Sequence, residues 1–130
     1  MSDENLNEQT GLVPYLRKIM VDWQLSPEQL AKVTHVTVVD LERYLKMSRA
    51  ELDELPSMPA GLESAMPLVS VYKNLNRMVA TSEEQNEWLV TPHDLFEGNK
   101  PIEVMAMSPQ HLMWVSYTLE SAAREQGLFR

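Results

Sequence analysis

Residues 25–44 read LSPEQLAKVTHVTVVDLERY and contain two helix starts separated by one turn. Ser26 stands before Pro27, and Gln29 follows three residues after the serine, which is the capping-box pattern of a helix start. We expect the helix that begins here to end at residues 33–35. The first half of the stretch therefore predicts one short, well-capped helix.

The second half of the stretch predicts another helix directly after a tight turn. Thr37 provides a polar cap for a helix over residues 38–46. Val36, in the turn, is expected to point inward, and the small Ala31 stands where two helices have to cross closely. Together these features predict the layout of a helix-turn-helix.

Apolar residues recur at every third or fourth position along the rest of the chain. This spacing places them on one side of a helix and does not suit a strand. Further helices are expected to be capped by Ser48, Ser82 and Ser108, to be entered at about Ser64, and to start at Pro101. The sequence thus predicts an all-α fold of seven or eight helices. Its expected apolar stripes are Leu12, Leu16, Ile19 and Trp23; Leu68, Tyr72, Leu75 and Val79; and Leu112, Val115, Leu119 and Ala122.

The clearest break in the helical pattern is PSMPAG at residues 56–61, because two prolines and a glycine cannot continue a helix. We expect an N-terminal helical unit to pack against a C-terminal one across this break. The predicted divisions are a disordered lead at 1–10, a helix-turn-helix unit at 11–55, a Pro/Gly linker at 56–63 and a second helical unit at 64–130.

Composition excludes several classes of protein. The chain has 130 residues, 11 basic against 19 acidic ones, and a net charge of -8, which argues against coating nucleic acid or an anionic membrane by bulk charge. It has no cysteine, and therefore no disulfide framework or thiolate nucleophile. Neither a secretory signal nor a membrane-spanning stretch is visible in the sequence. We expect a cytoplasmic protein.

The acidity is unevenly distributed. Residues 11–50 carry six basic and four acidic side chains, whereas the rest of the chain carries five basic and fifteen acidic ones. Contact with DNA would therefore be local, weak and dependent on dimerisation. The acidic remainder favours a protein partner with a basic face.

The stretch at 25–44 resembles the Xre-type helix-turn-helix, although His35 stands where that family usually has a turn glycine. In the functional interpretation, the helix that follows Thr37 enters the major groove of DNA. This helix is poor in the side chains that read base edges, so the alternative is a packing unit with the same shape. The candidate DNA-binding residues are Lys32, Thr37, Val38, Val39, Arg43 and Lys46.

Residues 88–105 form a second informative stretch, WLVTPHDLFEGNKPIEVM. It resembles the toxin-binding domain of the Xre/MbcA/ParS antitoxins, with the family positions held by Trp88-Leu89, Pro92-His93, Leu95, Gly98, Pro101, Glu103 and Val104-Met105. The resemblance covers roughly residues 68–127. The chain departs from the family at two places, with Ala80-Thr81 before the Trp-bearing helix and Gln110-His111-Leu112 in the last segment.

The resemblance implies an antitoxin that dimerises, occludes the active site of a toxin encoded next to it and represses its own promoter. In the family that toxin consumes NAD or transfers parts of it. The implied partners are therefore a cognate toxin, operator DNA and a second copy of the chain, with no membrane. The implied toxin-binding and motif residues are Trp88, Leu89, Pro92, Leu95, Gly98, Lys100, Pro101, Leu128, Phe129 and Arg130.

Structural roles account for many of these residues. Trp88, Leu95 and Phe96 are expected to be buried, Gly98 to adopt a positive φ, and Pro101 to start a helix. The apolar pair Leu128-Phe129 packs either on the chain's own core or in a partner's groove, and the sequence leaves both open. Met105, Met107 and Met113 are expected to fill the core beside Phe96 and Trp114.

No residue pattern in the sequence indicates catalysis or a cofactor. His35, His93 and His111 lie far apart, without the spacing of a metal site, and no nucleophile elbow or phosphate loop is present. We therefore expect no enzyme activity, catalytic residue, metal or cofactor. Two alternatives to the antitoxin stay open at this stage. They are a helix-turn-helix regulator without a toxin and a non-catalytic helical dimerisation module.

Overall fold

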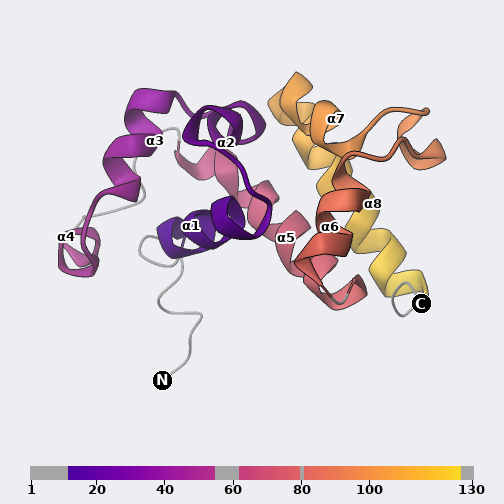
Figure 1. Ribbon diagram of the computed structural model, residues 1–130, viewed down its shortest axis with the longest axis horizontal. Helices are drawn as coiled ribbons and strands as arrows, with labels where there is room; N and C mark the ends of the chain where they lie inside the picture. Colours follow the sequence, from indigo (N-terminus) through magenta and orange to yellow (C-terminus); the bar gives the residue numbers. More distant parts are fainter. Residues whose placement is uncertain (1–11, 55–61, 80, 127–130) are drawn as a thin grey trace.

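The computed structural model describes residues 12–54, 62–79 and 81–126, and most of them are helical (Figure 1). The predicted all-α fold is confirmed, and the described residues form no extended strand. Their only β-type pairing is an isolated bridge between His93 and Asn99. In chain order the elements are α1 (Leu12–Asp22), α2 (Pro27–Thr34), α3 (Val38–Leu45), α4 (Arg49–Asp53), η3 (Leu62–Ala65), α5 (Met66–Met78), α6 (Ser82–Leu89), η4 (Asp94–Phe96), α7 (Pro101–Met107) and α8 (Pro109–Gln126).

Helix α2 begins with the predicted capping box. The hydroxyl of Ser26 accepts a hydrogen bond from the Gln29 backbone N–H at 3.1 Å, and the Gln29 side chain accepts one from the Ser26 N–H at 2.8 Å. Ser48 and Glu51 form the same reciprocal pair at the start of α4. Thr37 caps α3, since its hydroxyl accepts from the Asp40 N–H at 3.2 Å. These starts follow from local sequence alone.

Two helix ends differ from the prediction. The cap of α6 is Thr81, whose hydroxyl accepts from the Glu84 N–H at 3.1 Å, whereas Ser82 is already helical. Two neighbouring hydroxyl residues compete for this cap, and only Thr81 has the extended backbone that a cap requires. The helix expected from Ser64 begins instead as the short 3-10 helix η3, which leads into α5 at Met66.

The turn between α2 and α3 comprises three residues. His35 has a φ of +64°, the left-handed conformation that glycine usually takes at a helix end, and its N–H donates to the Ala31 carbonyl at 2.8 Å. Val36 is buried, as predicted. The His35 ring lies with Nε2 at 2.9 Å from the Met105 carbonyl oxygen, so the turn is attached to α7.

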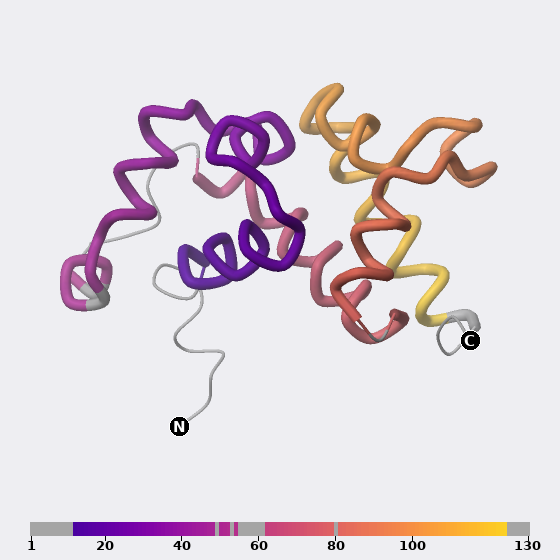
Figure 2. Tube along the Cα trace, viewed as in Figure 1, coloured from indigo at the N-terminus to yellow at the C-terminus, as the bar shows by residue number. Residues whose placement is uncertain are grey.

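Helix α5 lies between the two groups of helices. Figures 1 and 2 show α1–α4 on one side of it and α6–α8 on the other. It packs against α1, α2 and α8, and α2 also packs against α7. One continuous cluster of buried apolar side chains runs through both groups. The predicted N- and C-terminal units therefore share a core.

Polar contacts join the end of α1 to α5 and α6. The Trp23 indole N–H donates to Gln85 Oε1 at 3.0 Å, and the Gln85 amide donates in turn to Asn76 Oδ1 at 2.7 Å. The Asn86 side chain donates to the Asp22 carbonyl at 3.1 Å. Gln85 is buried and uses both ends of its amide, so this contact fixes α6 against α1.

The division into units is not tested, and it stays a prediction. The lead at 1–10, most of the linker at 56–63, and Leu55 lie outside the described residues. Of the predicted linker positions, Leu62 and Glu63 lie in η3, and Leu62 is buried. Among the described helices, none is both long and apolar enough to cross a membrane.

Candidate functional site

The segment from α6 to α7 forms a closed loop around η4. The N–H groups of His93 and Gly98 donate to the carbonyls of Asn99 and His93, at 3.2 and 2.9 Å. Gly98 has a φ of +83°, as predicted, and a Cβ added there would meet nothing within 4 Å. The backbone conformation alone therefore favours glycine at this position. Pro101 is the first residue of α7, also as predicted.

Four aromatic rings gather beside this loop. Phe96 is fully buried, with ring centroids 6.1 Å from Trp88 and 5.5 Å from Trp114, both edge-on. His93 packs against Trp88 at 5.1 Å. Phe96 therefore anchors η4 between the end of α6 and the first half of α8.

The burial predictions for this region were partly wrong. Phe96 and Met105 are buried as expected, and Trp88 is half-buried. Leu95, expected to be buried, is 56% exposed, because the short turn of η4 directs Phe96 inward and its neighbour outward. The expectation that Met107 and Met113 fill the core is also wrong, since both are exposed.

Four apolar residues in or beside this group of aromatic rings are exposed. Leu95 neighbours Phe96 in the chain, Trp114 contacts its ring, and Met113 and Tyr117 lie within one turn of Trp114 on α8. Their exposures are 56%, 36%, 41% and 60% respectively. We call Leu95, Met113, Trp114 and Tyr117 the Trp114 surface. Large apolar groups exposed on one helix and on the loop that packs against it make a candidate interaction site.

Sequence reasoning missed most of this surface. The pattern did contain a signal, because α8 carries Met113, Trp114 and Tyr117 in addition to the predicted stripe of Leu112, Val115, Leu119 and Ala122. Leu112, Val115 and Leu119 of this stripe are buried, together with Ser116. A helix with more large apolar residues than one buried face can hold must expose some of them.

The other family-motif residues divide by burial. Leu89 and Pro101 are buried, so their side chains serve the scaffold rather than direct contact. Pro92 is exposed, and Lys100 is half-buried at the start of α7. The predicted terminal site residues Leu128, Phe129 and Arg130 lie outside the described residues.

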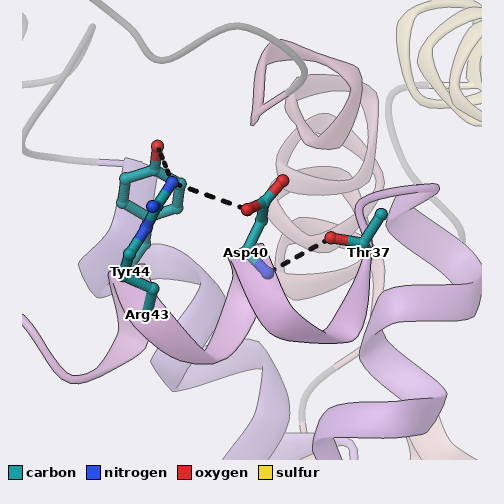
Figure 3. A network of polar contacts seen from close by, with 4 residues as sticks. All are labelled: Thr37, Asp40, Arg43 and Tyr44. Atoms are coloured by element: carbon teal, nitrogen blue, oxygen red, sulfur yellow. Dashed lines mark hydrogen bonds and ion pairs between the residues drawn. The ribbon is translucent and has the colours of Figure 1, made fainter.

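The candidate DNA-binding residues lie on or next to α2 and α3. Lys32, Thr37 and Lys46 are exposed, Val38 is half-buried, and Val39 is 77% exposed. Figure 3 shows Arg43 between Asp40 and Tyr44, with Nη2 at 3.5 Å from Asp40 Oδ1 and 3.1 Å from the Tyr44 hydroxyl. Arg43 is thus already paired, which lowers its availability to DNA.

Replacing Asp40 by asparagine is expected to raise affinity for duplex DNA about two- to fivefold at low salt. The substitution removes a negative charge from α3 and releases Arg43, while the Thr37 cap, which uses the Asp40 backbone, is retained. Fluorescence anisotropy with a labelled duplex measures the change. Glu63→Gln, the same charge change in η3, is the control. An equal gain in both variants would exclude a specific role for α3.

The three histidines lie in different surroundings. The Ser108 hydroxyl is 2.7 Å from His111 Nδ1, whereas His35 and His93 contact backbone carbonyls. Within the described residues no three His, Cys, Asp or Glu side chains are grouped as metal ligands. Comparisons with protein-family models, curated proteins and solved structures found no match to this chain. Among the described residues, the Trp114 surface is the feature most typical of a protein-binding site.

Proposed function

We propose that this chain is an antitoxin-like protein whose C-terminal helices bind and occlude a partner toxin enzyme, of the kind that targets NAD. The observation that supports this most is the Trp114 surface. It lies beside the loop formed by the stretch at 88–105, which is the part of the chain that resembles an antitoxin toxin-binding domain. The mechanism is stoichiometric, since the chain blocks access to the toxin's active site.

The chemistry of the surface suits a tight protein contact. Tryptophan and tyrosine are enriched among the residues that dominate binding energy, since each buries a large area while losing few rotatable bonds. Trp114 is held in place by the buried Phe96, and Leu95 by the turn that closes at Gly98. Little ordering is therefore needed when a partner binds.

In this proposal some residues shape the loop and others contact the toxin. Leu89, Gly98 and Pro101 set the course of the chain from α6 to α7, and the Trp114 surface makes the apolar contact. Glu83, Glu84 and Glu87 give α6 an exposed acidic face on the same C-terminal half of the chain. A toxin with a basic rim around its active site fits this charge, which speeds encounter and orients the complex.

Replacing Trp114 by alanine is expected to weaken the complex with the toxin at least about thirtyfold, because central aromatic residues contribute 2 kcal/mol or more at such contacts. The assay is co-expression with the product of the adjacent gene, followed by co-purification, titration calorimetry and growth rescue. Leu95→Ala is a second variant that spares the ring cluster. Val21→Ala removes a more exposed apolar side chain at the end of α1, and it should bind as the wild type does.

The proposal includes dimerisation and repression of the chain's own promoter through α3, in the cytoplasm. A wild-type chain that forms no complex with any neighbouring product, but shifts its promoter fragment in a salt-sensitive way, would contradict the antitoxin and favour a regulator. A stable dimer in light scattering with neither activity would favour a dimerisation module.

A further inference from the structure

A hollow of about 880 Å³ opens between α1, α5 and α8. Its floor contains the buried apolar residues Leu12 and Val69, and Tyr15, Met66 and Ala123 extend the apolar lining toward the rim. Its volume lies within the range of about 300–1,000 Å³ that is common for small-molecule sites. None of the four residues of the Trp114 surface lines it, so it is a separate feature of the molecule.

Two cations stand on one side of the hollow without a carboxylate partner among the described residues. Lys73 and Arg77 are one helical turn apart on α5, so their side chains are neighbours. The Lys73 ammonium lies 4.8 Å from the centre of the Tyr15 ring, and Arg77 Nη1 donates to Asn74 Oδ1 at 3.2 Å. Both contacts orient a cation and leave its charge uncompensated.

Asn74 is a buried polar residue, and its hydrogen bonds explain its place in the floor. Its amide nitrogen donates to the Ser70 carbonyl at 3.1 Å, which directs its oxygen toward Arg77. A buried amide on an apolar wall is unfavourable unless both ends are used. Here the side chain holds the guanidinium at the edge of the hollow.

The other charged residues of the hollow compensate each other. Arg124 Nη2 lies 3.2 Å from Glu120 Oε2 on α8, opposite α5. The net charge of the lining is therefore carried by Lys73 and Arg77. In a chain of net charge -8, two adjacent cations that have no carboxylate partner in the described part of the chain form a local positive site over an apolar floor.

We propose that this hollow binds a small amphiphilic carboxylate. The carboxylate group contacts Lys73 and Arg77, and a hydrocarbon portion lies along Leu12, Val69 and Met66. Charge-assisted hydrogen bonds fix the head, while burial of the hydrocarbon supplies the remaining affinity. This site is independent of the antitoxin function, because it shares no residue with the Trp114 surface.

Titration calorimetry with decanoate, below its micelle concentration, tests the site in the full chain. We expect saturable binding of one decanoate, and no binding of decyltrimethylammonium, which has the same hydrocarbon and the opposite charge. The double variant Lys73→Gln/Arg77→Gln is expected to weaken decanoate binding about tenfold to a hundredfold. Lys32→Gln/Lys46→Gln, which removes two exposed cations from the α2–α3 region, should bind as the wild type does.

A second variant probes the apolar half of the hollow. Met66→Glu places a negative charge beside the hydrocarbon and should abolish binding, and because Met66 is exposed this change leaves the fold intact. Trp114→Ala should bind decanoate normally, which separates this site from the toxin contact. Decanoate that fails to bind, or binds equally to the Lys73→Gln/Arg77→Gln variant, would overturn the proposal. So would binding of an acidic amphipathic peptide in place of decanoate.

Discussion

Replacing Phe96 by alanine is expected to lower the free energy of unfolding by about 3–5 kcal/mol. The Phe96 side chain is fully buried, and its ring packs edge-on against the rings of Trp88 and Trp114. Truncation removes this buried area and leaves a cavity between two tryptophans that belong to different helices. The loss is a large fraction of the stability of a domain of this size.

Leu95 provides the matched control, because it is the neighbouring residue in η4 and is mostly exposed. Leu95→Ala is expected to change the free energy of unfolding by less than about 0.5 kcal/mol. Urea denaturation followed by circular dichroism measures both variants, and an unchanged m-value shows that the midpoint reports stability. Equal losses of unfolding free energy in the two variants would contradict an η4 that buries Phe96 and exposes Leu95.

The parts of the fold that sequence predicted well are those set by neighbours in the chain. The Ser26–Gln29 and Ser48–Glu51 capping boxes bring a side chain to a backbone group three residues away, and each gave the correct helix start. Gly98 was predicted correctly for the same reason, since a tight turn after a short helix requires a positive φ.

The parts that sequence could not predict depend on residues far apart in the chain. The hydrogen bond from Trp23 to Gln85 joins residues 62 positions apart, and the contact of His35 with Met105 joins residues 70 apart. Neither contact can be predicted from the residues that neighbour it in the chain. Which of Leu95 and Phe96 points inward from η4 likewise depends on a distant residue, because Phe96 packs on Trp114 of α8.

In residues 11–50, the position of each basic side chain decides whether it is available to DNA. Arg17 donates from α1 to the carbonyls of Leu45 and Met47, so it caps the end of α3. Arg43 is paired with Asp40. Arg17 and Arg43 are therefore engaged within the protein, and DNA binding by α3 would depend on the exposed Lys32 and Lys46 together with an Arg43 released from Asp40.

Raising the pH from about 10 to about 12 is expected to lower the free energy of unfolding through Tyr72 by about 2–3 kcal/mol. Burial, together with the hydrogen bond that the hydroxyl donates to the Asp22 carboxylate, raises the pKa of Tyr72 to about 12. The unfolded chain loses this proton near pH 10, whereas the native protein still holds it. The contribution is therefore complete below pH 10 and is lost as the pH rises to 12.

The comparison of Tyr72→Phe with Tyr117→Phe isolates this effect, because lysines and the other tyrosines titrate in all three proteins. Tyr72→Phe should be less stable at neutral pH by about 1–2 kcal/mol, since Asp22 loses a hydrogen-bond donor, and its stability should fall less steeply above pH 10 than that of the wild type. Tyr117 is 60% exposed, and its replacement should leave the wild-type pH dependence. Urea denaturation at a series of pH values between 8 and 12 gives the slopes. Parallel slopes for Tyr72→Phe and the wild type would show that the Tyr72–Asp22 contact does not control the loss of stability at alkaline pH.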